Sequence, residues 1–150
     1  MKNNPIKTNA ADRNHPGFKK EAEPFFNIVM EGLKGRVDGD HFWDAVSEDA
    51  VFEFRYRFPG FAGKIVGRDA YMEWFEGYSA VLHSTDNLRT YEATAAGVII
   101  LEYEVHGIIP STGKKYDNRF CSIVTVRDKK IAHWIDYCDS LAIMTSYSPD

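Results

Sequence analysis

The amino-acid sequence predicts an α+β fold, in which helices of the first half pack against a curved sheet formed mainly by the second half. Apolar residues recur at helical spacing between residues 18 and 34 and between residues 69 and 83, whereas alternation prevails from residue 87 onward. Turn signals divide that later stretch into consecutive hairpins. Helices followed by a run of hairpins are typical of α+β domains.

The size of the chain indicates a single domain. It has 150 residues, of which 44% are hydrophobic and 27% are charged, enough for one core and too few for two. Residues 1–16 are polar, contain two prolines and show no periodicity, so we expect a flexible tail there. The domain is then predicted to span residues 17–150.

Charge and motif content exclude several classes of partner. The net charge is -4 and no stripe of Lys or Arg is present, so we expect no nucleic acid and no membrane as partner. No apolar run reaches the roughly 20 residues that span a bilayer, and the N-terminus lacks a secretory signal, which predicts a cytoplasmic protein. Cys121 and Cys138 fit no ligand cluster and are expected to be reduced. Without a phosphate-binding glycine loop, a nucleophile elbow or a His-Glu-x-x-His motif, we expect no cofactor and no metal.

Apolar spacing and turn residues set the predicted boundaries of the elements. Pro24 is expected near the start of the first helix or at a kink in it, and Gly35 and Gly39 are expected to end that helix. Asp40 can cap the second helix. The predicted helices span residues 18–34, 40–46 and 69–83, and the predicted strands span 50–58, a short segment ending at 66–67, 88–95, 97–109, 115–127 and 130–139.

The predicted last strand carries the most informative residue. Asp136 lies there among aromatic and aliphatic side chains, with Trp134 and Cys138 on the same face. Burial disfavours the charged form of a carboxylate and raises its pKa toward neutrality, which suits a general acid or base. The alternative is a structural acid that hydrogen-bonds Trp134, Ser122 or the backbone, because structural networks also perturb pKa values.

The turn between the last two strands decides which residues face Asp136. A three-residue turn with Lys129 in the left-handed conformation would pair Ser122 with Asp136, and a two-residue turn would shift the pairing by one residue. We favour the first register, although glycine is commoner than lysine at such a position. The first register puts Asn118, Phe120 and Ser122 in the pocket, with Phe120 opposite Cys138, and the second puts Arg119 and Cys121 there.

Three segments together resemble a known family. They are GD at 39–40 before EDAVFEF at 48–54, GRDAYMEWF at 67–75, and YDNRFCSIVTVRDKKIAHWIDYCDSLA at 116–142. Together they resemble the SnoaL-like branch of the superfamily that contains nuclear transport factor 2, ketosteroid isomerase, scytalone dehydratase, limonene epoxide hydrolase and polyketide cyclases. Over residues 18–145 the resemblance implies a cone-shaped barrel, in which a curved, mixed, mostly antiparallel sheet wraps around three helices and an apolar pocket. It also implies a homodimer formed through the outer face of the sheet.

The epoxide hydrolases of this superfamily match only in part. Asp136 stands where they hold a catalytic aspartate. Their Arg-x-Asp pair falls on Glu102 and Glu104, so that the acid is kept and the arginine is lost. Their water-binding tyrosine and asparagine fall on Phe52 and Phe54, whose phenyl rings cannot hydrogen-bond water.

Ketosteroid isomerase matches less well. Its general base falls on Phe54, its tyrosine near Gly32 and its protonated aspartate near Ser122, and none of these residues can do the same work. What remains resembles the polyketide cyclases and related SnoaL-like proteins, in which a late-strand aspartate acts as acid or base on a polarised carbonyl compound.

Two placements remain open for the acidic strand 97–109. Glu104 and His106 share one of its faces, which simple patterning puts in solvent and which the resemblance allows in the pocket. If Glu104 meets Asp136, one of the two carboxyl groups keeps its proton near neutral pH, and His106 could set which one. Asn118 could then orient a carbonyl oxygen.

These observations define the functional hypotheses. We expect an enzyme without cofactor that moves a proton on a small, mostly apolar carbonyl compound, as an isomerase, aldol-type cyclase or dehydratase. The alternatives are a non-catalytic module that binds a hydrophobic ligand or dimerises and, less favoured, an epoxide hydrolase variant. The candidate catalytic residues are Asp136, Glu104 and His106, and the candidate substrate-binding residues are Asn118, Phe120, Ser122, Trp134, Cys138, Phe52, Phe54, Tyr56, Tyr71 and Trp74.

Overall fold

A computed structural model describes residues 9–18, 22–57, 59–60 and 62–150 of the chain. The described helices are the short 3-10 turn η1 (Pro16–Phe18) and the α-helices α1 (Glu23–Gly32), α2 (Phe42–Ala45), α3 (Arg68–Ser79) and α4 (Ser140–Tyr147). None of these described helices has the length and apolar character that crossing a membrane requires.

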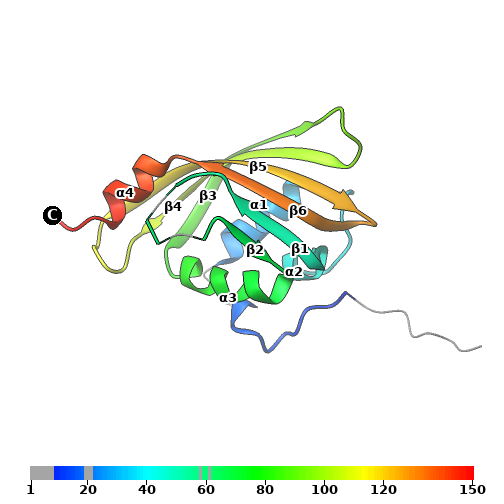
Figure 1. The fold of residues 1–150 in the computed structure, drawn as a ribbon, viewed down its shortest axis with the longest axis horizontal. Helices are drawn as coiled ribbons and strands as arrows, with labels where there is room; N and C mark the ends of the chain where they lie inside the picture. Colours follow the sequence, from blue (N-terminus) through cyan, green and yellow to red (C-terminus); the bar gives the residue numbers. More distant parts are fainter. Residues whose placement is uncertain (1–8, 19–21, 58, 61) are drawn as a thin grey trace, which may run out of the picture.

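Six strands form one sheet in the order β2-β1-β6-β5-β4-β3. β1 and β6 are parallel, and every other neighbouring pair is antiparallel. The sheet curls around α1 without closing, and α3 lies along its open side (Figure 1). The prediction of a cone-shaped α+β fold with a mixed, mostly antiparallel sheet is therefore confirmed. The strands are β1 (Val46–Phe54), β2 (Lys64–Val66), β3 (Leu82–Glu92), β4 (Val98–Ile108), β5 (Lys115–Arg127) and β6 (Lys130–Cys138).

Most element boundaries agree with the sequence prediction, and the differences have local causes. α1 begins at Glu23, because Pro24 is tolerated in the first turn of a helix and not in its interior. α2 is shorter than predicted and is capped by His41, whose Nδ1 accepts from the backbone N–H of Trp43. β3 begins six residues earlier than predicted, at Leu82, which pairs with Gly107 of β4.

Helix α4 was not predicted. Asp139, expected to be a strand-end residue, is also its N-cap and accepts from the backbone N–H groups of Leu141 and Ala142. The helix lies at the end of the sheet opposite the β5–β6 turn (Figure 1). It packs Ile143 inward and leaves Leu141 and Met144 largely exposed.

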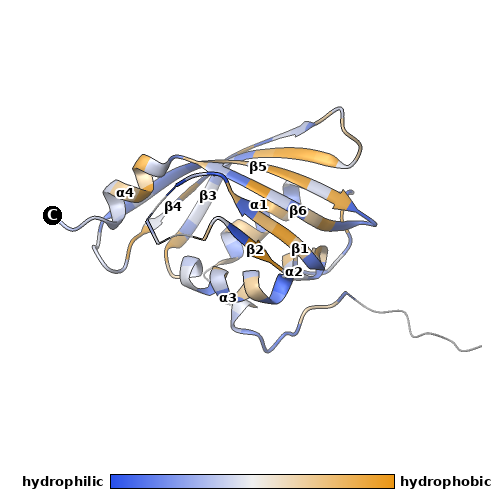
Figure 2. Cartoon of the chain, in the orientation of Figure 1, coloured by the Kyte–Doolittle hydropathy of each residue, from blue (hydrophilic) through white to orange (hydrophobic). Residues whose placement is uncertain are grey.

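The inner face of the sheet and the helices enclose one aromatic-rich core. Hydrophobic and hydrophilic residues are interspersed along β5 and β6 (Figure 2), and buried positions alternate with more exposed ones over most of both strands, as expected for strands with one buried face. Phe25 of α1 lies at the centre of this core, with ring centroids 5.0 Å from Phe75, 6.0 Å from Tyr103 and 6.2 Å from Trp134. Helices α1 and α3 are thereby fixed against the strands that carry the candidate site.

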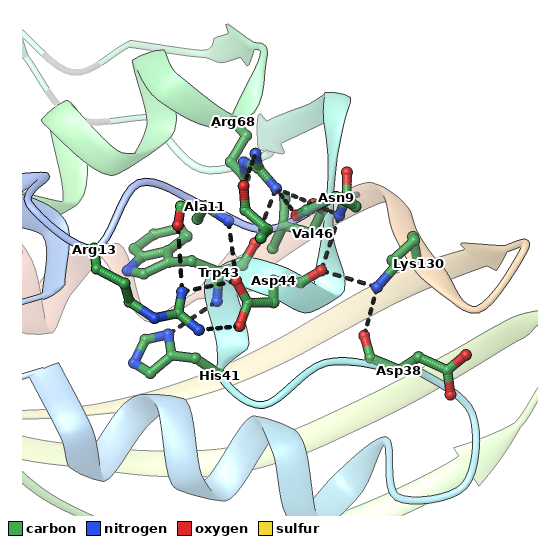
Figure 3. Close-up of polar contacts among 11 residues, drawn as sticks. Asn9, Ala11, Arg13, Asp38, His41, Trp43, Asp44, Val46, Arg68 and Lys130 are labelled. Carbon is green, nitrogen blue, oxygen red and sulfur yellow. Dashed lines mark hydrogen bonds and ion pairs between the residues drawn. The ribbon is translucent and has the colours of Figure 1, made fainter. Parts of the chain in front are cut away.

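The N-terminal segment, residues 9–18, differs from the flexible tail that the sequence suggested, whereas residues 1–8 lie outside the described part of the chain. Arg13 binds both oxygens of the Asp44 carboxylate, at 2.8 and 2.5 Å, and Ala11 N–H donates to the same group at 3.0 Å (Figure 3). The guanidinium of Arg68, 5% exposed, donates to the carbonyl of Asn9 at 2.6 Å. The polar composition of this segment could not indicate these contacts, because the partner residues lie more than 30 positions away in the sequence.

Candidate active site

Asp136 faces the interior of the cone from the middle of the sheet. It pairs with Phe54 on the parallel strand β1 and with Ser122 on the antiparallel strand β5. Residues directly opposite each other share a face of the sheet, so these side chains point to the same side. The side chain is 5% exposed.

One oxygen of the Asp136 carboxyl group receives a set of buried donors. Ser122 Oγ donates to Oδ1 at 2.5 Å, and Trp134 Nε1 donates to the same atom at 2.6 Å. Because the Ser122 proton is used in this way, the hydroxyl of Tyr103, 2.8 Å away, donates to Ser122 Oγ. Among the described residues no donor reaches Oδ2, so Oδ2 is the oxygen that a ligand can meet.

Burial raises the pKa of Asp136 from 3.8 to about 6, and the hydrogen bonds from Ser122 and Trp134 oppose this rise. Desolvation dominates because water no longer stabilises the charged form. The pKa values of Tyr71 and Tyr103 lie well above the usual value, first because both are buried and second because Asp136 is near. These tyrosines stay protonated, and Asp136 changes charge close to neutral pH.

A cavity next to Asp136 is enclosed by α3, the inner face of the sheet and α4. The cavity has a free volume of ≈ 30 Å³, enough for about two water molecules. Asp136 is the only charged side chain among its described lining residues. They are Phe25, Tyr56, Tyr71, Trp74, Phe75, Tyr78, Tyr103, Val105, Tyr116, Phe120, Asp136, Ile143 and Tyr147.

A second polar group lies in the wall of the same cavity. Asn118 Nδ2 donates to the hydroxyl oxygen of Tyr116 at 3.0 Å, and the hydroxyls of Tyr78 and Tyr116 are 3.3 Å apart. Asn118 Oδ1 accepts from the backbone N–H groups of Arg119 and Asp139, at 2.8 and 3.0 Å. An amide oxygen bound by two N–H groups cannot be exchanged with the amide nitrogen, so the orientation of Asn118 is fixed.

The predicted register between β5 and β6 is confirmed, but the predicted turn is wrong. Ser122 pairs with Asp136 and Phe120 with Cys138, as expected. The turn has two residues, Asp128 and Lys129, both with positive φ (51° and 63°). A bulge at residue 132 then adds one residue to β6 and restores the register that the longer turn would have given.

Glu104 and His106 lie on the outer face of the sheet, so the predicted pairing of Glu104 with Asp136 is wrong. Glu104 forms an ion pair with Arg119 at 3.2 Å and accepts from Asn87. His106 bridges Asp117 and Asp86, at 2.6 and 2.8 Å, and these carboxylates raise its pKa. The apolar side chains of β4 occupy the inner face instead, because burying them stabilises the fold and burying the charged row does not.

The other predicted site residues surround Asp136 to different depths. Phe120, Tyr56, Tyr71 and Trp74 line the cavity directly. Phe52 stacks behind Tyr71 with a centroid distance of 3.6 Å, and Phe54 contacts Trp74 at 4.8 Å, so both support lining rings. Ser122 and Trp134 donate to Asp136, and Asn118 donates to the Tyr116 hydroxyl. Burial raises the pKa of the Cys138 thiol to about 12, so this thiol stays protonated.

Several lining residues were not among the predicted site residues. Tyr103 and Val105 were missed because the face of β4 was left open, whereas Tyr116 carried a usable signal, since strand alternation puts it on the same face as Asn118 and Phe120. Ile143 and Tyr147 belong to the unpredicted helix α4. Tyr78 carried a usable signal, since it follows Tyr71 and Trp74 on one face of α3 at helical spacing.

A mixed sheet curled around helices, with a cavity lined by aromatic rings and one buried carboxyl group, defines the architecture of this α+β domain. A family model described as the SnoaL-like domain matches residues 29–134, and the chain belongs to this family. The uncharacterised protein YesE of Bacillus subtilis (strain 168) is 28% identical over 133 residues, which are 87% of this chain and 88% of that protein.

Solved structures share the fold at low sequence identity. An NTF2-like protein from Burkholderia xenovorans LB400 aligns with a TM-score of 0.62 and 17% identity, covering 85% of this chain and 93% of that one. A protein with a ketosteroid isomerase-like fold from Catenulispora acidiphila DSM 44928 aligns with a TM-score of 0.61 and 13% identity, covering 82% of this chain and 93% of that one.

Proposed function

We propose that this protein transfers protons on a small, mostly apolar carbonyl compound, with Asp136 as the general base and acid. The observation that carries the proposal is the environment of Asp136: a buried carboxyl group beside a cavity, with Oδ1 held by two donors and a pKa of about 6. A catalytic acid or base works best when its pKa is near the working pH.

The chemistry requires only the side chains of the cavity. The Asp136 carboxylate takes a proton from the carbon next to the carbonyl, and the electron pair of that C–H bond moves to the carbonyl oxygen to give an enolate. The same carboxyl group then returns the proton to carbon or to oxygen, so that the base is regenerated. Donors on Oδ1 hold the group in one orientation while Oδ2 exchanges the proton.

The experiment is deuterium exchange of an enolisable ketone. Acetophenone in D2O loses its methyl proton signal in proton NMR spectra as the enol forms. We expect the wild-type protein to accelerate this loss and Asp136→Asn to reduce the protein-dependent rate at least about 100-fold. The rate should rise with pH around about 6, because the carboxylate is the base. Asp69→Asn, an exposed change on α3, is the control.

The exchange rate and the melting temperature of Asp136→Asn together decide whether Asp136 is the base. Asp136→Asn keeps the shape of the side chain, so its melting temperature shows whether the fold is intact. Equal exchange rates for the wild-type protein and Asp136→Asn would refute Asp136 as the base.

A non-catalytic binding module is the second candidate. The absence of another charged side chain among the described lining residues favours it, because many acid–base enzymes use two titratable groups. The Catenulispora acidiphila protein with the same fold is described in complex with trimethylamine, which supports a small ligand. Ligands that bind in the cavity and are always recovered unchanged, without deuterium incorporation, would support this candidate.

We also propose that the protein forms a homodimer through the outer face of the sheet. Tyr91, Ile100, Ile123 and Ile135 pair in succession across β3, β4, β5 and β6, so they form one apolar row on that face. Glu102 and Cys121 form the next pair on that face, and the ion pair of Glu104 with Arg119 lies one pair further along the strands. An apolar row with charged residues of both signs on the same face suits an isologous contact.

A further inference from the structure

We propose that Tyr78 and Tyr116 form a hydroxyl pole of the cavity that binds an uncharged carbonyl or hydroxyl oxygen of an aromatic ligand. Asn118 is the positioning residue behind this pole. The inference rests on the proposed function for the role of Asp136, and it adds the class of ligand and the residues that select it.

The hydroxyl pole has one hydroxyl proton more than its described contacts use. Tyr78 and Tyr116 carry two hydroxyl protons, and the contact between them uses one. Asn118 Nδ2 donates to Tyr116 Oη and therefore cannot receive a proton from it. Whichever tyrosine donates to the other, the remaining hydroxyl proton meets no acceptor among the described residues. An acceptor oxygen in the cavity would satisfy it.

The pole is fixed before a ligand arrives. The two backbone N–H groups on Asn118 Oδ1 set the direction of its amide nitrogen, and this nitrogen sets Tyr116. Burial raises the pKa values of Tyr78 and Tyr116 above their usual range, so both remain donors at neutral pH. A fixed donor contributes more to binding than one that must be ordered.

Charge in the cavity selects against ionic ligands. A carboxylate or phosphate ligand would meet Asp136 and find no Lys, Arg or His among the described lining residues. An ammonium ligand could pair with the Asp136 carboxylate, but a cation has no lone pair that accepts the spare hydroxyl proton of the pole. A neutral ligand with an acceptor oxygen satisfies this proton without bringing a second charge into the cavity.

The walls of the cavity favour a flat ligand. On α3 the ring planes of Tyr71 and Trp74 differ by 10°, and those of Trp74 and Tyr78 by 21°. On the sheet, the planes of Tyr103 and Phe120 differ by 5°. Because the free space holds about two water molecules, binding must also move part of the wall.

Four compounds of similar size test the inference by equilibrium binding, followed in NMR spectra of the protein. Acetophenone carries a neutral acceptor oxygen, ethylbenzene carries none, benzoate is an anion and benzylammonium is a cation. We expect acetophenone to bind most tightly and the double variant Tyr78→Phe with Tyr116→Phe to weaken it about 3- to 10-fold, because either tyrosine alone would still offer one free hydroxyl proton. The affinity for ethylbenzene should stay within about twofold.

Controls separate a lost hydrogen bond from a disturbed fold. Tyr91→Phe, on the outer face, should change neither affinity. Asn118→Ala should weaken acetophenone and not ethylbenzene, a selectivity that a merely structural role would not produce. Equal weakening of both compounds by the double tyrosine variant, tighter binding of either ion, or no binding of acetophenone would overturn the inference.

The two proposals fail in different ways. Binding is measured without turnover, so a protein that shows the expected affinities and no deuterium exchange keeps the hydroxyl pole and loses the proton-transfer function. A protein that exchanges deuterium at the same rate after both tyrosines are changed, with unchanged acetophenone affinity, keeps the function and loses the pole.

Discussion

The carboxyl group of Asp136 is favourable for the fold when it is neutral and unfavourable when it is charged, because burial raises its pKa from 3.8 to about 6. Between these two pH values the folded protein binds more protons than the unfolded chain, so the free energy of unfolding falls as the pH rises. The difference corresponds to roughly 3 kcal/mol. Such a cost is typical of groups kept for function.

This cost gives a prediction for Asp136→Asn. From pH 4 to pH 8, we expect the wild-type protein to lose about 2 kcal/mol of unfolding free energy relative to the variant, which cannot ionise, because the unfolded carboxyl group is already partly ionised at pH 4. Urea unfolding of both proteins at the two pH values measures the difference. A difference that does not change with pH would show that the carboxyl group is not desolvated in the folded state.

At the scale of elements, hydrogen bonds in both directions hold the N-terminal segment, residues 9–18, against α2 and α3. Asp44 accepts from this segment, and Arg68, at the start of α3, donates to it (Figure 3). α3 carries cavity-lining rings, so the segment helps to fix a wall of the site. We therefore propose that the domain begins before residue 17.

Asp44 tests this assignment. The hydrogen bond from Arg13, with that from Ala11, lowers the pKa of Asp44 to about 2, and burial opposes the change. We expect Asp44→Ala to cost about 1–3 kcal/mol at pH 7, mainly because the Ala11 N–H group loses its partner. The charged part of this loss should decrease as the pH falls from about 4 through about 2, because below the folded pKa the carboxyl group is protonated in both states. Asp69→Ala, exposed on α3, should cost less than about 0.5 kcal/mol.

The junction between α3 and β3 depends on one glycine of β4. A Cβ atom at Gly107 would lie 1.8 Å from the carbonyl oxygen of Val81, which is backbone and cannot rotate away. We expect Gly107→Ala to destabilise the protein by about 3 kcal/mol or to prevent folding. Gly77→Ala is the matched control, because a Cβ there meets nothing within 4 Å and alanine favours a helix.

Thermal unfolding of the two glycine variants measures this difference. Gly77→Ala should stabilise the protein by about 0.5–1 kcal/mol, whereas Gly107→Ala should destabilise it. Similar melting temperatures for both variants would show that β3 and β4 separate at this point without cost.

At the scale of the whole molecule, periodicity predicted the order of the elements up to residue 139 and most strand boundaries, whereas the inward direction of Asp136 was expected from its apolar neighbours and from the resemblance. Two features could not be read from local sequence. The bulge at residue 132 is set by pairing with β5 and compensates for the two-residue turn. Helix α4 lacks an apolar stripe, since Leu141 and Met144 are exposed. The face of Glu104 was left open for a different reason, because alternation put its side chain in solvent, as the structure does, and only the resemblance allowed it in the pocket.

The outer face of the sheet gives the prediction that concerns the assembly. Ile123 lies in the middle of the apolar row, between Ile100 and Ile135. A glutamate there would put an uncompensated charge in the centre of the proposed contact, where the cost of desolvation is greatest. We therefore expect light scattering to show a dimer for the wild-type protein and a monomer for Ile123→Glu. Thr145→Glu, on the exposed side of α4, should leave the dimer intact.

The same experiment separates assembly from the site. The side chain of Ile123 points away from the cavity, since residues 122 and 124 of β5 are buried on the inner face. A monomeric Ile123→Glu that keeps its affinity for acetophenone would show that each cone binds its ligand independently. A wild-type protein that is monomeric at all concentrations would instead leave the apolar row as a surface without a partner copy, and would remove the homodimer from the proposed function.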